Sequence, residues 1–346
     1  MQIVYSPEHA RHDPQSFMVR GRIGPASEVP ERARVLLEAV EGDGHAVVAP
    51  RRHDGAARGR VHSPEYLGFL ETAHERWSQL PGAGPEVMGN AFPGRPGAAR
   101  PRHIVGQAGY HLGDGACPVG AQTWQAALAS SEVALTAADL VLEGASAAYG
   151  LCRPPGHHAF RDMAAGFCFL NNAAIATERL LPACGRAALL DIDIHHGNGT
   201  QAVFWERDDV LFVSIHADPA DFYPWFWGGA DQRGGGQGLG FTINLPLALG
   251  TQDDLWLETL DGALAAIARF APEVLVVSLG LDAQEGDPVG GFRVTTPGFA
   301  RAGEALGGFA RGHDLPTVLI QEGGYLCDNL GRNLAATLGG FESARG

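Results

Sequence analysis

The stretch Ala187–Thr200 reads AALLDIDIHHGNGT and passes directly from an apolar run into a group of acids and imidazoles. The apolar start is typical of a parallel strand covered on both faces of a sheet. Side chains two residues apart lie on the same side of a strand, so Asp191, Asp193 and His195 share one face near its carboxyl end. Open α/β sheets bind ligands at that edge, and this residue set suits a divalent metal ion. The alternative, a solvated loop with capping acids, fits poorly with a strand otherwise built for burial.

Further apolar runs of strand length occur along the chain, with amphipathic segments between them. The expected strands are Ile3–Tyr5, Ala46–Ala49, Ala147–Cys152, Ala187–Ile192, Val210–Ile215, Thr242–Leu245, Val274–Leu279 and Thr317–Gln321. The expected helices are Pro30–Glu41, Pro64–Leu80, Thr123–Leu142, Asn171–Leu181, Asp253–Phe270 and Pro297–Gly312. This alternation predicts an α/β fold with a mostly parallel sheet. We find no internal repeat and no second-domain boundary, which favours a single domain over residues 1–346.

Two segments do not follow the alternation of strand and helix. Residues 81–120 are rich in Gly, Pro and Arg and have little periodicity. Residues 217–240 hold an aromatic cluster at 222–227, FYPWFW, followed by a Gly-rich run. Loops of this length in a compact domain are usually functional or disordered, so we interpret both as long loops.

Two adjacent histidines, His157 and His158, follow the expected strand Ala147–Cys152 across the turn Arg153–Gly156. An unperturbed imidazole titrates near neutral pH, so the pair is suited to proton transfer. A histidine pair by itself is more often structural or surface-exposed. Its position after a parallel strand favours a function.

Asp282 and Tyr325 also follow apolar strands, within SLGLD at 278–282 and EGGY at 322–325. A buried lone carboxylate is costly, so Asp282 needs a partner such as a metal ion; a helix cap is the alternative. A phenol at the end of a strand can donate a hydrogen bond to an oxyanion, although a structural tyrosine after a Gly turn is common. Together the strand-end residues supply metal ligands, an acid–base pair and a hydrogen-bond donor for an oxyanion, which are the groups that metal-assisted amide hydrolysis needs.

Composition argues against several classes of partner. The net charge is -14, all 25 basic residues are Arg, and no basic cluster stands out, so we expect no nucleic acid. No apolar run reaches the ~18 residues of a membrane helix, and the N-terminus resembles a strand and not a signal peptide. The cysteines are odd in number and lack zinc-finger spacing, which predicts reduced thiols in a cytoplasmic protein. They are Cys117, Cys152, Cys168, Cys184 and Cys327.

These motifs, in this order and spacing, resemble the zinc-dependent histone deacetylase superfamily, and most closely its bacterial acetylpolyamine amidohydrolase branch. The matching segments are Arg153–His158, Gly166–Asn172, Asp191–Thr200, Gly280–Asp282 and Glu322–Tyr325. The resemblance implies the arginase–deacetylase fold, with an eight-stranded parallel sheet between helices. It also implies one Zn²⁺ on Asp193, His195 and Asp282, with Fe²⁺ or Co²⁺ as possible substitutes.

The same resemblance implies the roles of the catalytic residues. His158 would be the general base and acid, His157 would assist electrostatically, and Asp191 and Asn198 would orient the two imidazoles. Many histone deacetylases carry Asp where this chain has Asn198, so His158 would be less basic at rest. Tyr325 would stabilise the tetrahedral oxyanion opposite the metal.

Further residues are implied to bind substrate or a structural K⁺ ion. The substrate-binding set comprises Gly166, Phe167, Tyr223, Val289 and Gly324, of which Phe167 and Tyr223 would line the tunnel. The potassium set comprises Asp191, Asp193, His195, Ser214 and Ile215. The insertion at about 81–120 resembles the loop that mediates dimerisation in the polyamine enzymes, which predicts a homodimer.

The positions that hold a distal ammonium in known relatives are not acidic here. By alignment they are Phe17, Val105 and Ala116, although Asp114 or Asp13 could substitute. Val289 stands where a polyamine-selective branch has Glu, and the rim gains Trp225 and Trp227. These departures leave acetylpolyamines, acetyl-lysine and more apolar amides open as substrates.

The predicted function is therefore deacylation of an N-acylated amine by zinc-activated water. One alternative is a binuclear-manganese ureohydrolase of the same fold, which needs further ligands that neither His196–Asn198 nor Leu281–Ala283 obviously provides. The other is a non-catalytic protein that binds acylated amines.

Overall fold

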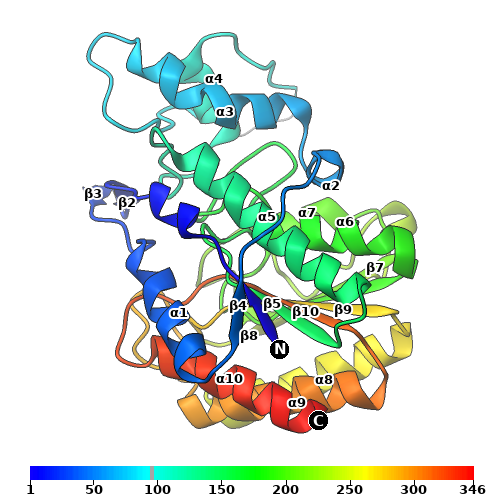
Figure 1. Cartoon of the computed structure of the whole chain (residues 1–346). Helices are drawn as coiled ribbons and strands as arrows, with labels where there is room; N and C mark the ends of the chain where they lie inside the picture. Colours follow the sequence, from blue (N-terminus) through cyan, green and yellow to red (C-terminus); the bar gives the residue numbers. More distant parts are fainter. Residues whose placement is uncertain (94–96) are drawn as a thin grey trace.

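An eight-stranded sheet forms the centre of the computed structural model, which describes residues 1–93 and 97–346 (Figure 1). Its strand order is β4-β1-β5-β10-β9-β6-β7-β8, and every neighbouring pair is parallel. The strands are β1 (Gln2–Val4), β4 (Ala46–Val48), β5 (Ala147–Gly150), β6 (Ala187–Asp191), β7 (Val210–Ala217), β8 (Thr242–Leu247), β9 (Val274–Leu279) and β10 (Thr317–Gln321). Each matches a predicted strand within a few residues, so the predicted fold class is confirmed.

Helices cover both faces of this sheet, because successive side chains of each strand point to opposite sides. In β6, Leu189 joins one buried apolar cluster while Ala188 and Leu190 join the other. One face carries α1 (Glu31–Gly42), α8 (Asp253–Phe270), α9 (Thr296–Gly312) and α10 (Leu330–Arg345). The other carries α5 (Thr123–Leu142), α6 (Asn172–Cys184) and α7 (Asn198–Phe204). Helix α2 (Ala56–Val61) packs against α6, and α3 (Pro64–Ser78) and α4 (Ile104–His111) lie beyond α5.

Helix α5 corrects one expectation from the sequence. It is long and apolar enough to cross a membrane, although we expected no segment of that size. In the structure 67% of its most apolar window is buried, and the helix packs against α6 and β5. The protein core therefore accounts for its apolar side chains.

Several elements were not predicted from the sequence. Besides α2, α7 and α10, they include the hairpin of β2 (Phe17–Val19) and β3 (Arg22–Gly24) and the short 3-10 helices Pro7–Arg11 and Gly236–Gly238. Helix α4 lies inside residues 81–120, where we had expected only loop; residues 94–96 of that insertion lie outside the described residues. Its eight residues include Gly106 and Gly109, which weaken helix propensity. A Cβ on Gly109 would lie 1.6 Å from the Ala91 carbonyl oxygen, so the glycine lets the neighbouring backbone pack closely against the helix. This packing stabilises the helix and could not be predicted from the sequence.

The sheet order decides where the functional motifs meet. Strands β5, β10, β9 and β6 are consecutive neighbours in the middle of the sheet. The histidine pair follows β5, Tyr325 follows β10, Asp282 follows β9, and Asp193 and His195 follow β6. Because the strands are parallel, all four segments emerge at the same sheet edge.

Candidate active site

Asp193, His195 and Asp282 converge at this edge, as the sequence predicted. Their potential ligand atoms lie within 4.8 Å of one another. His195 Nδ1 is 3.1 Å from Asp193 Oδ1 and 3.1 Å from Asp282 Oδ2. Both carboxylates are fully buried, and His195 is 6% exposed. The group is therefore shielded from water and preorganised.

Backbone N–H groups and two glycines hold the carboxylates in this arrangement. Asp193 Oδ2 accepts a hydrogen bond from Gly323 N–H at 2.8 Å, and Asp282 Oδ1 accepts one from Ile194 N–H at 3.1 Å. A Cβ on Gly280 would lie 2.2 Å from Asp193 Oδ2, and one on Gly323 would lie 2.1 Å from Asp282 Oδ2. The glycines in the two strand-end motifs are thus required sterically, so that neighbouring loops can approach the carboxylates.

The two buried carboxylates, Asp193 and Asp282, favour a positive charge between them. Burial, followed by the nearby Asp193 charge, raises the pKa of Asp282, and the two carboxylates together raise the pKa of His195 to about 10 against the effect of burial. A proton on His195 or a metal ion can neutralise them, because paired buried carboxylates are otherwise unfavourable. Two oxygens and one imidazole nitrogen match the donor set of a catalytic zinc site with open positions. The residues present therefore fit the metal that the sequence resemblance implies.

His157 and His158 lie beside this group with their ring centroids 4.0 Å apart. His157 Nδ1 is 3.0 Å from Asp191 Oδ2, and His158 Nδ1 is 2.8 Å from Asn198 Oδ1. Burial disfavours a charge on both rings. For His157 the nearby carboxylates, Asp191 foremost, prevail and raise the pKa to about 10. For His158 burial and the adjacent His157 lower the pKa well below its usual range. One histidine is thus charged and the other neutral at pH 7, a division of roles typical of acid–base sites.

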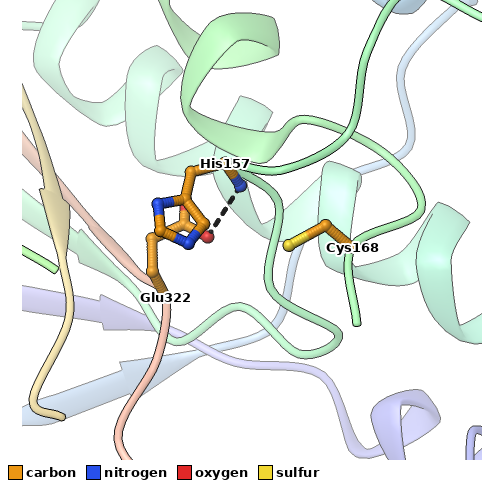
Figure 2. A group of neighbouring side chains, drawn as sticks. All are labelled: His157, Cys168 and Glu322. Atoms are coloured by element: carbon orange, nitrogen blue, oxygen red, sulfur yellow. Dashed lines mark hydrogen bonds between the residues drawn. The ribbon is translucent and has the colours of Figure 1, made fainter. Parts of the chain in front are cut away.

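Glu322 is a fully buried residue of the EGGY motif to which the sequence analysis gave no role. It lies with His157 and Cys168 in a second compact group of possible metal ligands (Figure 2). Glu322 and Cys168 already have protein partners. Glu322 Oε2 accepts N–H bonds from Gly156 at 2.6 Å and His157 at 3.1 Å, and Cys168 Sγ donates to the Gly166 carbonyl oxygen at 3.3 Å. Glu322 therefore holds the backbone that carries the histidine pair.

Tyr325 is 3% exposed and lies against an arginine that sequence reasoning missed. The Arg32 guanidinium lies 4.6 Å from the centre of the Tyr325 ring and donates to the carbonyl oxygens of Glu322 and Gly324. Glu28, also missed, accepts a hydrogen bond from Arg32 at 2.7 Å. The only sign of this in the sequence is that Arg32 falls on the apolar side of an amphipathic helix. That position does not indicate which residue it contacts. Burial raises the pKa of the Tyr325 phenol well above its usual range, so the hydroxyl keeps its proton.

Tyr223 and Phe167 each contact a catalytic residue, and Asp114 holds the segments that carry them. The Tyr223 hydroxyl donates to Asp114 Oδ2 at 2.7 Å, and the same oxygen accepts the Gly166 N–H at 2.9 Å. Phe167 has a left-handed backbone with φ 69°, and its ring centroid is 5.7 Å from that of Tyr325. Tyr223 packs edge-on to His158 at 5.0 Å. These contacts place the two predicted tunnel aromatics beside the catalytic groups.

A family model of the histone deacetylase domain matches residues 26–341. The chain belongs to the histone deacetylase family. An acetylpolyamine amidohydrolase of Burkholderia pseudomallei is 46% identical over 100% of both chains. Acetylpolyamine amidohydrolase 1 of Pseudomonas aeruginosa is 44% identical over 99% of both. The crystal structure of an acetylpolyamine aminohydrolase from Burkholderia pseudomallei matches the whole fold with a TM-score of 0.95, covering 100% of both chains.

The remaining predicted residues of this histone deacetylase family member lie as follows. Asp191 lies opposite Ser214 in the register of β6 and β7, and both are fully buried together with Ile215. Asp193 and His195 lie on the segment that follows β6. Val289 is half-buried on the loop that follows Asp282.

The aromatic loop of this family member contains a contact that the sequence did not reveal. Phe222 stacks on the His195 ring, with centroids 5.1 Å apart and an interplanar angle of 23°. Trp227 packs on Phe160, whereas Trp225 and Phe226 are 54% and 76% exposed. The loop thus packs against the His195 imidazole on one side and presents aromatic surface to solvent on the other.

Proposed function

We propose that this protein is a zinc-dependent amidohydrolase that removes an acetyl or similar acyl group from a small N-acylated amine, with acetylpolyamines first among the candidates. The convergence of Asp193, His195 and Asp282 beside a neutral and a charged histidine carries this proposal. Relatives named acetylpolyamine amidohydrolases that match the full chain favour a small acetylated amine over a protein substrate.

In this mechanism Asp193, His195 and Asp282 would hold the metal ion, which would make water more acidic and would polarise the acyl carbonyl. The neutral His158 imidazole accepts the proton of the attacking water and later donates it to the departing amine. His157, paired with Asp191, contributes positive charge nearby. The Tyr325 hydroxyl donates a hydrogen bond to the oxygen on which negative charge develops. The products are a carboxylic acid and a free amine, and no other reactant is needed.

The other features expected from the family resemblance belong to the same proposal. A potassium ion would be held by Asp191, Asp193, His195, Ser214 and Ile215 and would stabilise the adjoining ends of β6 and β7. The protein would form a homodimer through the insertion at 81–120. All five cysteines are free thiols, which is in keeping with the reducing cytoplasm.

A turnover panel with zinc-loaded enzyme tests the proposal. It should compare acetylputrescine, acetylspermidine and acetylcadaverine with an acetyl-lysine peptide and a trifluoroacetyl-lysine peptide. We expect release of acetate from the acetylated amines, loss of turnover after chelation, and recovery with added zinc. A preference for the peptides would replace the polyamine assignment, and no turnover of any substrate would favour a binding protein instead. Two manganese ions per chain in metal analysis would favour the ureohydrolase alternative.

A further inference from the structure

Asp287 links two loops of the site and has no role in the reaction described above. It is 9% exposed and lies on the loop between Asp282 and Phe292. Its Oδ2 accepts the Tyr325 N–H at 2.8 Å. Its Oδ1 accepts N–H bonds from Val289 at 2.8 Å and from Gly290 at 3.1 Å. One carboxylate therefore connects the segment after β9 with the segment after β10.

The bond to Tyr325 forms one half of a clamp on a single peptide unit. The Tyr325 N–H and the Gly324 carbonyl belong to the same peptide plane. Asp287 accepts from the N–H, while Arg32 Nε donates to the carbonyl oxygen at 2.5 Å. A carboxyl oxygen on one end and a guanidinium on the other hold this plane from both sides. The bond from Arg32 is charge-assisted, and such hydrogen bonds are about twice as strong as neutral ones.

This clamp matters because it fixes the backbone from which the phenol projects. Gly324 has φ +112°, a backbone region that ordinary residues avoid and that glycine enters freely. Within residues 1–93 and 97–346, no protein group hydrogen-bonds to the Tyr325 hydroxyl. The buried ring packs beside the Arg32 guanidinium and the Phe167 ring. The orientation of the peptide plane therefore sets the direction in which the side chain leaves the backbone, and the hydroxyl itself is not tied to any of these residues.

We propose that Asp287 is a positioning residue that aims the Tyr325 phenol at the reacting carbonyl by holding the 324–325 peptide plane. Its effect on turnover rests on the proposed function, because it acts only through the hydrogen bond that Tyr325 donates. The same carboxylate anchors Val289, so the phenol and this loop move as one unit.

A double-mutant cycle on the zinc-loaded enzyme tests this role. Asp287→Asn keeps the size of the side chain but replaces one of the two acceptor oxygens with an N–H donor. We expect kcat to fall about 10- to 100-fold, the size of losing a group that orients a catalytic residue, with KM nearly unchanged. In a Tyr325→Phe background the same change should cost nothing further. Glu285→Gln is the matched control, because Glu285 lies on the same loop and is exposed.

A rival explanation is that Asp287 acts through the metal ligand Asp282, whose carbonyl oxygen would lie 2.2 Å from a Cβ on Gly290. In that case zinc content would fall and the loss of kcat would persist in the Tyr325→Phe background, and either result would overturn the proposal. If Asp287→Asn does not fold, Asp287→Glu takes its place in the cycle, because it keeps the charge and displaces it by one methylene.

Amide hydrogen exchange gives a readout that does not depend on activity. Exchange of the peptide covering residues 323–327 should accelerate in Asp287→Asn and stay at the wild-type rate in Glu285→Gln. Unchanged exchange in Asp287→Asn would show that no clamp exists. If wild-type enzyme turned over no acetylated amine, the proposed function would fail while the exchange result still decided the clamp.

Discussion

The floor and the rim of the site are built in different ways. The floor comprises His157, His158, Asp193, His195, Asp282 and Tyr325, which lie just beyond four neighbouring strands and are almost completely buried. The rim comprises Phe17, Asp114, Phe167, Tyr223 and Val289, which come from a hairpin and from long loops. The floor supplies chemistry on a rigid sheet edge, whereas the rim is held by contacts such as that between Tyr223 and Asp114. Chemistry and substrate choice can therefore vary separately.

Removing a floor ligand should have the largest effect. Asp282→Ala deletes one of the three proposed metal ligands and leaves only Asp193 and His195. We expect the purified protein to lose bound zinc and turnover to fall to background. Metal analysis and an acetate-release assay measure both. Asp209→Ala, which breaks a surface ion pair with Arg207, should keep full zinc and activity.

Tyr325→Phe should have the next largest effect, because it removes a hydrogen bond that matters only as charge develops. We expect kcat to fall ~10²–10³-fold, the usual effect of losing one oxyanion donor, with zinc content and melting temperature unchanged. Tyr149→Phe is the matched control, since that buried phenol bonds to Gln321 within the sheet. Near-wild-type kcat at saturating substrate would rule out the assigned role.

Asn198→Asp should change the pH dependence more than the maximal rate. A carboxylate at 2.8 Å from His158 Nδ1 stabilises the imidazolium and raises the pKa of His158. The protonated imidazole cannot accept a proton from water. As the pH is lowered, the variant should therefore lose activity at a higher pH than the wild type does. We expect the acid limb of the kcat/KM profile to move up by about one pH unit or more.

A second histidine–asparagine pair provides the control for this shift. Asn244 Oδ1 lies 3.0 Å from His196 Nε2, outside the catalytic group. Asn244→Asp should leave the acid limb in place. An unmoved limb in Asn198→Asp would mean that His158 is not the base.

The smallest effect is expected at the rim. Tyr223→Phe removes the hydrogen bond to Asp114 but keeps the aromatic wall beside His158. We expect a change in kcat/KM of about tenfold or less, from one lost hydrogen bond, with the size differing between polyamine and lysine substrates. Tyr5→Phe, whose hydroxyl bonds to His9 at 3.0 Å, is the control. A fall in kcat/KM as large as that of Tyr325→Phe would mean that Tyr223 takes part in the chemistry. The floor and the rim would then not have separate roles.

The floor was more predictable than the rim because its signals are local. Apolar strands closely followed by Asp, His or Tyr identified the floor residues, and parallel pairing implied that they lie at one sheet edge. Only the strand order in the structure showed that the four segments are neighbours. Glu322, Arg32, Phe222 and Asp287 were missed as supporting residues. Each acts on a partner that is distant in the chain or through a backbone contact, and neither leaves a pattern in the neighbouring residues.

The sequence by itself determined the strands, the parallel α/β architecture and the chemical identity of the floor, because burial and side-chain periodicity act over a few residues. Only the tertiary structure decided that α4 forms within the insertion and that the Tyr223 hydroxyl meets Asp114. It also decided that Asp287 and Arg32 clamp the peptide before Tyr325. These features depend on packing and hydrogen bonds between segments far apart in the chain, whose free energy exists only once the sheet has brought them together.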